Sequence, residues 1–142
     1  MAKRGVDEGF SEAEREAMRE RARELRARRG PKRDPDEEVR ERIAQLPEPD
    51  RTLALRIHEI VREEAPALTP RLWYGMPAYA KAGSVLCFLQ PASKFGTRYA
   101  TFGFTDAARL DEGSWWPVSF ALTALEPETE ETIRRLLRKA LG

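Results

Sequence analysis

The stretch of residues 71–89, RLWYGMPAYAKAGSVLCFL, is where the chain changes from helical to sheet-forming sequence. A continuous apolar run from Val85 to Leu89 follows the turn residue Gly83, a pattern typical of a buried strand. Upstream, Gly75 and Pro77 bracket a bend in an extended segment, where we expect a β-bulge that redirects side chains. The stretch therefore predicts the first strands of a sheet.

The aromatic side chains place the rest of the sheet downstream. Of 12 aromatic residues in the chain, all but Phe10 lie between Trp73 and Phe120. Residues 98–104 form another strand candidate with aromatics on both faces, and residues 120–122 form a shorter one. We expect an antiparallel sheet of about three to five strands.

Helical sequence flanks the sheet region on both sides. Residues 36–46, 49–65 and 127–141 carry apolar side chains at helical spacing. In the second of these, Leu55 falls opposite the apolar face, so we expect another element to cover it. In the last, the expected core-facing positions are Ile133, Leu136, Leu137 and Ala140. The fold class that follows is α+β: a small antiparallel sheet packed against helices, with an N-terminal charged helix appended.

The N-terminal helix is predicted from a capping box, Ser11 to Glu14, which opens a helix over residues 12–29. Its apolar stripe is thin, and ion pairs one turn apart are expected to stabilise it locally. The stripe consists of Met18, Ala22 and Leu25, and the expected pairs are Glu12–Arg15, Glu16–Arg19, Glu20–Arg23 and Glu24–Arg28. Because such a helix packs little, we divide the chain into a charged extension, residues 1–33, and an α+β domain, residues 34–142. We expect the extension to be mobile or to bind a partner.

The composition of the 142 residues excludes several classes of protein. One Cys excludes an intrachain disulfide scaffold and a zinc site built mainly on thiolates. The net charge of +1 argues against wholesale attraction to nucleic acid. No apolar run approaches the ~18 residues of a membrane span, so we expect a soluble, cytoplasmic protein without a membrane partner. The charge is uneven, however: Arg19 to Arg33 holds eight cations and two acids. An alternative function is therefore a protein- or nucleic-acid-interaction adaptor acting through this basic stretch.

No catalytic template is complete. His58 begins a pattern similar to that of zinc proteases, but Arg62 stands where the second histidine would be. We expect His58 on the flank of its helix, with a role as ligand or base as the alternative. Cys87 with His58 as its base would form a nucleophilic dyad, but its place in the most apolar strand favours core packing. We therefore favour a non-enzymatic protein.

A small-molecule cleft is the other alternative function. Aromatic and sulfur-containing side chains of the WYGMPAY segment could line it, with basic side chains at its polar end. The candidate ligand-binding residues are Trp73, Tyr74, Met76, Tyr79, Lys94 and Arg98. The other interpretation of the same residues is a sheet core with a polar rim.

Several motifs in the sheet region match one known family. They are residues 73–79, 87–88, 94–95, 98–101, 103–104, 116–117 and 120–122. With these motifs, residues 36–141 resemble the YdhG-like family of small bacterial domains of unknown function. The resemblance implies an α+β fold grouped with frataxin-like proteins, some of which are labelled iron chaperones.

The resemblance makes a small binding protein the leading expectation for function, with weak iron binding and exchange with an iron-handling partner. A frataxin-like iron surface uses exposed carboxylates as hard oxygen ligands. The best acidic cluster in the chain is Asp34, Asp36, Glu37 and Glu38. Arginines lie beside this cluster and would weaken divalent cation binding.

Overall fold

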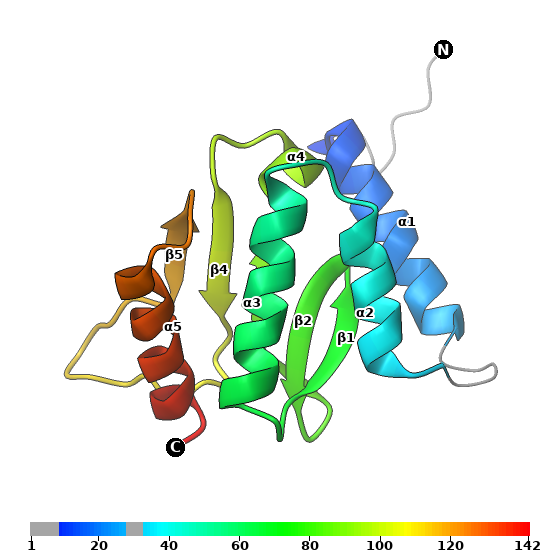
Figure 1. The fold of residues 1–142 in the computed structure, drawn as a ribbon. Helices are drawn as coiled ribbons and strands as arrows, with labels where there is room; N and C mark the ends of the chain where they lie inside the picture. The colour runs from blue at the N-terminus through cyan, green and yellow to red at the C-terminus, as the bar shows by residue number, and fades with distance from the viewer. Residues whose placement is uncertain (1–8, 28–32) are drawn as a thin grey trace, which may run out of the picture.

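Five antiparallel strands form one sheet in the computed structural model, which describes residues 9–27 and 33–142 (Figure 1). The strands pair in chain order, so the sheet is a simple meander. They are β1 (Thr69–Trp73), β2 (Met76–Lys81), β3 (Ser84–Gln90), β4 (Ala100–Phe104) and β5 (Ser119–Leu122). Because β1 and β5 pair on one side only, they are the two edges of the sheet.

Helices cover one face of the sheet. They are α1 (Glu12–Ala27), α2 (Pro35–Ala44), α3 (Asp50–Glu64), α4 (Ala92–Phe95) and α5 (Pro127–Ala140). α2, α3 and α5 lie side by side across that face, and α1 lies beyond α2 at the β1 edge (Figure 1). The short α4 connects β3 to β4 and lies next to α1. The predicted α+β class is confirmed. None of the helices in the described part of the chain is long and apolar enough to cross a membrane.

The bend that the sequence places between Gly75 and Pro77 is a hairpin turn, so the β-bulge expected there is wrong. Trp73 pairs with Met76, and Tyr74 and Gly75 between them have φ of 54° and 78°. Two central residues with positive φ form the turn whose twist matches that of the flanking strands. A glycine supplies one of these positions without steric cost.

A register shift of the bulge type occurs instead between β2 and β3. Tyr79 pairs with Cys87, whereas Ala80 pairs with Val85, so Leu86 is the extra residue. Leu86 and Cys87 are both fully buried in the core cluster. The shift therefore lets two consecutive side chains of β3 enter the core.

The core lies between the sheet and the helices over it. Ile57, Ile60 and Val61 of α3 are fully buried, as their helical spacing predicts. Each such side chain contributes about 1.5–3 kcal/mol through burial. Leu55 is 38% exposed, so the expectation that another element covers it is wrong. In α5, the described side chains that face the core are those of Ile133, Leu137 and Ala140, with Leu136 half-buried beside them.

The capping box that opens α1 is confirmed. The Ser11 amide donates to Glu14 Oε1 at 2.9 Å, and the Glu14 amide donates to Ser11 Oγ at 3.1 Å. The predicted apolar stripe is not the face that packs, because Met18 is 36% and Leu25 is 45% exposed. Ala17 is the buried residue of this helix. The last two residues of the predicted helix, 28 and 29, lie outside the described residues.

Candidate functional site

The β1–β2 turn presents two adjacent backbone N–H groups to a carboxylate. Glu24 on α1 accepts a hydrogen bond from the amide of Tyr74 at 3.1 Å and from the amide of Gly75 at 2.8 Å. Consecutive amides in a turn that point at one anion form a binding concavity for negative charge. Both residues have positive φ, as the two central positions of this type of hairpin turn require.

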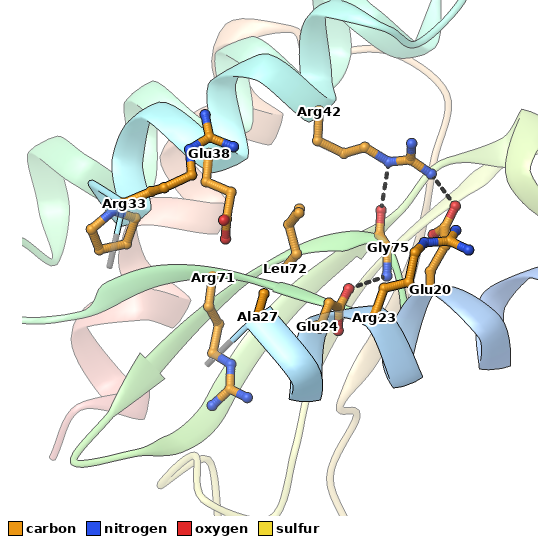
Figure 2. A pocket seen from close by; sticks show the side chains of 11 residues that line it. Glu20, Arg23, Glu24, Ala27, Arg33, Glu38, Arg42, Arg71, Leu72 and Gly75 are labelled. Carbon is orange, nitrogen blue, oxygen red and sulfur yellow. Dashed lines mark hydrogen bonds and ion pairs between the residues drawn. The ribbon is translucent and has the colours of Figure 1, made fainter. Parts of the chain in front are cut away.

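Two cations complete the anion site. Lys94 on α4 donates from Nζ to Glu20 Oε2 at 2.8 Å, and the Arg42 guanidinium donates to Glu20 Oε1. Arg42 Nε also donates to the carbonyl of Gly75 at 3.3 Å (Figure 2). We call the Tyr74 and Gly75 amides, Arg42 and Lys94 together the turn cradle. In the structure the cradle holds two carboxylates of α1.

The carboxylates in the cradle are largely withdrawn from solvent. The side chains of Lys94, Glu20 and Glu24 are 9%, 11% and 12% exposed. Electrostatic interactions are stronger in such a site than at the surface, because less water screens them. The cradle should therefore bind a negatively charged group more strongly than a neutral one.

Local structure explains the positions of Lys94 and of the turn. α4 is held against α3 by Asp50, a buried residue whose Oδ2 accepts from the amide of Ser93 at 2.8 Å. This contact places Lys94, the next residue along α4. At the turn itself, a Cβ added to Gly75 would lie 1.4 Å from Glu20 Oε2. Only glycine allows the carboxylate to approach the backbone this closely.

A groove of about 680 Å³ adjoins the cradle, between α1, α2 and β1 (Figure 2). Its charged walls include Arg23, Arg33 and Arg71, with Glu38 opposite and Leu72 at its floor. The Nε atom of Arg71 is buried and has no hydrogen-bond partner among the residues that the structure describes. The volume is within the range of small-molecule sites.

The six candidate ligand-binding residues do not form one cluster. Trp73 and Tyr74 meet edge to face beside the turn, and Lys94 belongs to the cradle. Met76 is buried, and Tyr79 is fully buried on the side of α3. The remaining candidate, Arg98, lies over the ring of its neighbour Tyr99, 5.2 Å from the ring centroid.

Sequence reasoning missed Glu20, Glu24 and Arg42 as site residues. The expected Glu20–Arg23 pair is wrong, because Glu20 binds Arg42 and Lys94 while Arg23 pairs with Glu16. The Glu12–Arg15 and Glu16–Arg19 pairs are confirmed, and the partner expected for Glu24, Arg28, lies outside the described residues. The one signal in the sequence was two glutamates one turn apart in a helix.

His58 is fully buried, so its expected position on a helix flank is wrong. Its Nε2 lies 2.7 Å from Asp36 Oδ1, and its Nδ1 lies 2.8 Å from the hydroxyl of Tyr79. Burial lowers the pKa of His58 and outweighs the opposing effect of Asp36, so the ring is neutral. A neutral ring that donates from Nε2 accepts at Nδ1 from Tyr79. The three side chains thus form a satisfied polar network between α2, α3 and β2.

Cys87 is buried in the core, as expected. Burial raises the pKa of its thiol well above the usual range, and it lies opposite Tyr79 in the β2–β3 pairing. A thiol in this environment stays protonated and is a poor nucleophile.

Two residues of the acidic cluster and several of the basic stretch are engaged in local contacts. Asp34 caps α2 through the amide of Asp36, whose own carboxylate also meets Arg40 and Arg62. Among residues 9–27 and 33–142, no three His, Cys, Asp or Glu side chains come together as a group that could hold a metal ion. In the basic stretch, the described cations that have acidic partners are Arg19, Arg21, Arg23 and Arg33.

Fold and site together define a small α+β domain with an antiparallel meander and a carboxylate-filled cradle on its first hairpin turn. No protein-family model, curated protein or solved structure matches the chain. The resemblance to the YdhG-like family therefore depends on the sequence motifs alone and stays a prediction.

Proposed function

We propose that the chain is a non-enzymatic binding protein that recognises an anionic group, a carboxylate or a phosphate, at the turn cradle. The observation that carries this proposal is the occupancy of the cradle by Glu20 and Glu24, whose oxygens accept from two backbone amides, Arg42 and Lys94. The same donors suit the oxygens of any carboxylate or phosphate.

The surroundings of the cradle favour binding over catalysis. The turn amides and Lys94 are fixed by the hairpin and by the Asp50 contact, so little ordering is needed when an anion binds. The adjoining groove gives the rest of a ligand room beside the anionic group.

The test uses a full-length variant in which the cradle is freed, Glu20→Ala with Glu24→Ala. Inorganic phosphate and glutarate are titrated into this variant while the amide resonances of Tyr74 and Gly75 are followed by NMR. We expect saturable shifts of both resonances, and their loss when Lys94→Met is added. Lys81→Met, which removes an exposed lysine at the far end of β2, is the matched control and leaves the shifts unchanged.

Resonance shifts that stay linear in anion concentration, or that persist after Lys94→Met, would contradict the proposal. Circular dichroism of each variant separates loss of binding from loss of fold.

The other expected functions stay predictions. Weak iron binding depends on the family resemblance, and calorimetric titration with ferrous iron under anaerobic conditions tests it, with magnesium as competitor. A nucleic-acid role for Arg19 to Arg33 predicts binding that weakens steeply as salt rises.

A further inference from the structure

We infer, on the basis of the proposed function, that the partner of the turn cradle is an acidic helix of another protein. That helix carries two glutamates one turn apart. In this chain α1 occupies the same site in cis and keeps it closed.

The spacing of the bound carboxylates argues for a helix rather than for separate anions. Glu20 and Glu24 are four residues apart in α1, so both lie on one helix face. The first binds the side-chain cations and the second binds the turn amides. Two carboxylates held at this separation on a rigid rod match both halves of the cradle at once.

A third contact adds sequence specificity. Arg21 lies with its guanidinium carbon 5.5 Å from the ring centroid of Tyr74 and pairs with Glu24 at 3.4 Å. A cation over an aromatic face is favourable, more so when both are partly shielded from water. The recognised pattern is therefore Glu-Arg-x-x-Glu on one helix turn, with each of its three charged side chains in contact with the turn or the cradle.

The way α1 docks also makes it exchangeable. Ala17 is the residue of α1 that is buried, while Phe10, Met18 and Leu25 remain exposed. Apolar burial thus contributes little to docking, and the charged contacts of Glu20 and Glu24 contribute most of it. A helix that presents the same charged side chains can make the same contacts in its place.

Because α1 belongs to the same chain as the cradle, it competes strongly with a helix of another protein. A segment of the same chain is present at its site at an effective concentration on the order of millimolar. A partner helix with the same contacts therefore binds wild-type protein weakly and a protein with α1 released much more tightly. The release of α1 would be the step that exposes the cradle.

The experiment measures binding in trans of a fluorescent peptide with the sequence of residues 9–27, by anisotropy, to the full chain. For the Glu20→Ala, Glu24→Ala variant we expect at least about tenfold tighter binding than for wild type, since the cis competitor is lost. The matched control, Glu12→Ala with Glu16→Ala, changes two exposed glutamates at the same spacing in the first half of α1 and binds as weakly as wild type. A peptide that itself lacks both cradle glutamates should not bind.

If the double variant does not fold, as judged by circular dichroism, Glu24→Ala alone takes its place, because Glu20 then still pairs with Arg42 and Lys94. Equal binding of the peptides with and without the two glutamates, or no gain over wild type, would overturn the acidic-helix partner. In that case phosphate and glutarate binding to the same variant decides the proposed function separately. Saturable resonance shifts on anion addition would support anion binding at the turn cradle. Their absence would refute both anion binding and the acidic-helix partner.

Discussion

The Nε2 atom of His58 lies 2.7 Å from Oδ1 of Asp36, and this contact joins the middle of α3 to the first turn of α2. The carboxylate is only an acceptor, so His58 donates from Nε2 and its Nδ1 accepts from the Tyr79 hydroxyl. Burial opposes the charge of Asp36, but its hydrogen bonds with Arg40 and His58 prevail and lower its pKa. The network therefore pairs a charged, partly exposed carboxylate with a neutral, fully buried ring.

The stability of the protein should fall with pH below about 6.5. The pKa of His58 is lowered by burial from its ordinary value of 6.5, so in this range the unfolded chain binds a proton that the folded chain does not. The unfolding free energy then decreases as pH falls, with a slope of up to about 1.4 kcal/mol per pH unit until the folded-state pKa is reached. Asp36 has its own pKa lowered and contributes only at more acidic pH, below its ordinary 3.8. Urea unfolding at pH 5, 6 and 7 measures the slope.

The control for this prediction is His58→Gln. His58 is the only histidine in the chain, so the variant removes every imidazole titration at once. The variant should be less stable than wild type at pH 7, and its unfolding free energy should change little between pH 7 and pH 5. An undiminished slope in the variant would show that other groups cause the pH dependence.

Replacement of Tyr79 by Phe should cost about 1–3 kcal/mol of unfolding free energy, because it leaves the buried Nδ1 of His58 without a donor. Thermal and urea unfolding measure the cost. Tyr99→Phe is the comparison, since Tyr99 is half-buried and its hydroxyl makes no hydrogen bond to another described residue, so its change should stay within about 0.5 kcal/mol. Equal costs for the two variants would contradict the role of the network.

Gly75→Ala should destabilise the protein more than Gly83→Ala. Both glycines have positive φ in two-residue hairpin turns, 78° and 85°, so backbone strain is similar. At Gly83 an added Cβ meets nothing within 4 Å, whereas at Gly75 it meets Glu20 and comes within 2.8 Å of Lys94 Nζ. We expect an extra cost of about 1 kcal/mol or more and faster trypsin cleavage within α1. Similar unfolding curves and similar cleavage rates in the two variants would show that the docking of α1 does not depend on the close approach of Glu20 to Gly75.

Asp50→Ala should loosen α4 and, through it, the turn cradle. The variant removes the acceptor of the Ser93 amide, and we expect a loss of about 1–2 kcal/mol in unfolding free energy. In the background with Glu20 and Glu24 replaced by Ala, it should also weaken phosphate binding several-fold, because Lys94 is no longer held in place. Asp111→Ala, at an exposed loop position, is the control for both measurements. Unchanged phosphate affinity would show that Asp50 does not position Lys94 for anion binding.

The fold was predictable where local pattern is strong. Pro127 at the start of α5, the capping box at Ser11 and the apolar face of α3 each follow from short-range geometry, and the structure confirms them. The β1–β2 bend was expected as a bulge between Gly75 and Pro77, whereas the structure has a hairpin turn at Tyr74 and Gly75, with Pro77 inside β2. Whether a glycine bend bulges one strand or reverses the chain depends on which strand pairs across it, and that partner was not visible in the local sequence.

The candidate site was much less predictable, for an energetic reason. Ion pairs one helical turn apart are worth only about 0.3–0.5 kcal/mol, so they do not decide the partner of an exposed glutamate. Glu20 has a nearby arginine, but it binds a lysine 74 positions away, where both side chains are shielded from water. Burial of polar partners decides such choices, and burial is a property of the assembled molecule.

The sequence alone determined the secondary structure of α1, α3 and α5, the sheet-forming second half and the burial of Cys87, because periodicity and caps act within a few residues. The tertiary structure decided the partners of the polar groups. It buries His58 between Asp36 and Tyr79, and it brings the acidic face of α1 to the β1–β2 turn. These pairings depend on which elements pack together, since hydrogen bonds and charges gain strength only where packing excludes water.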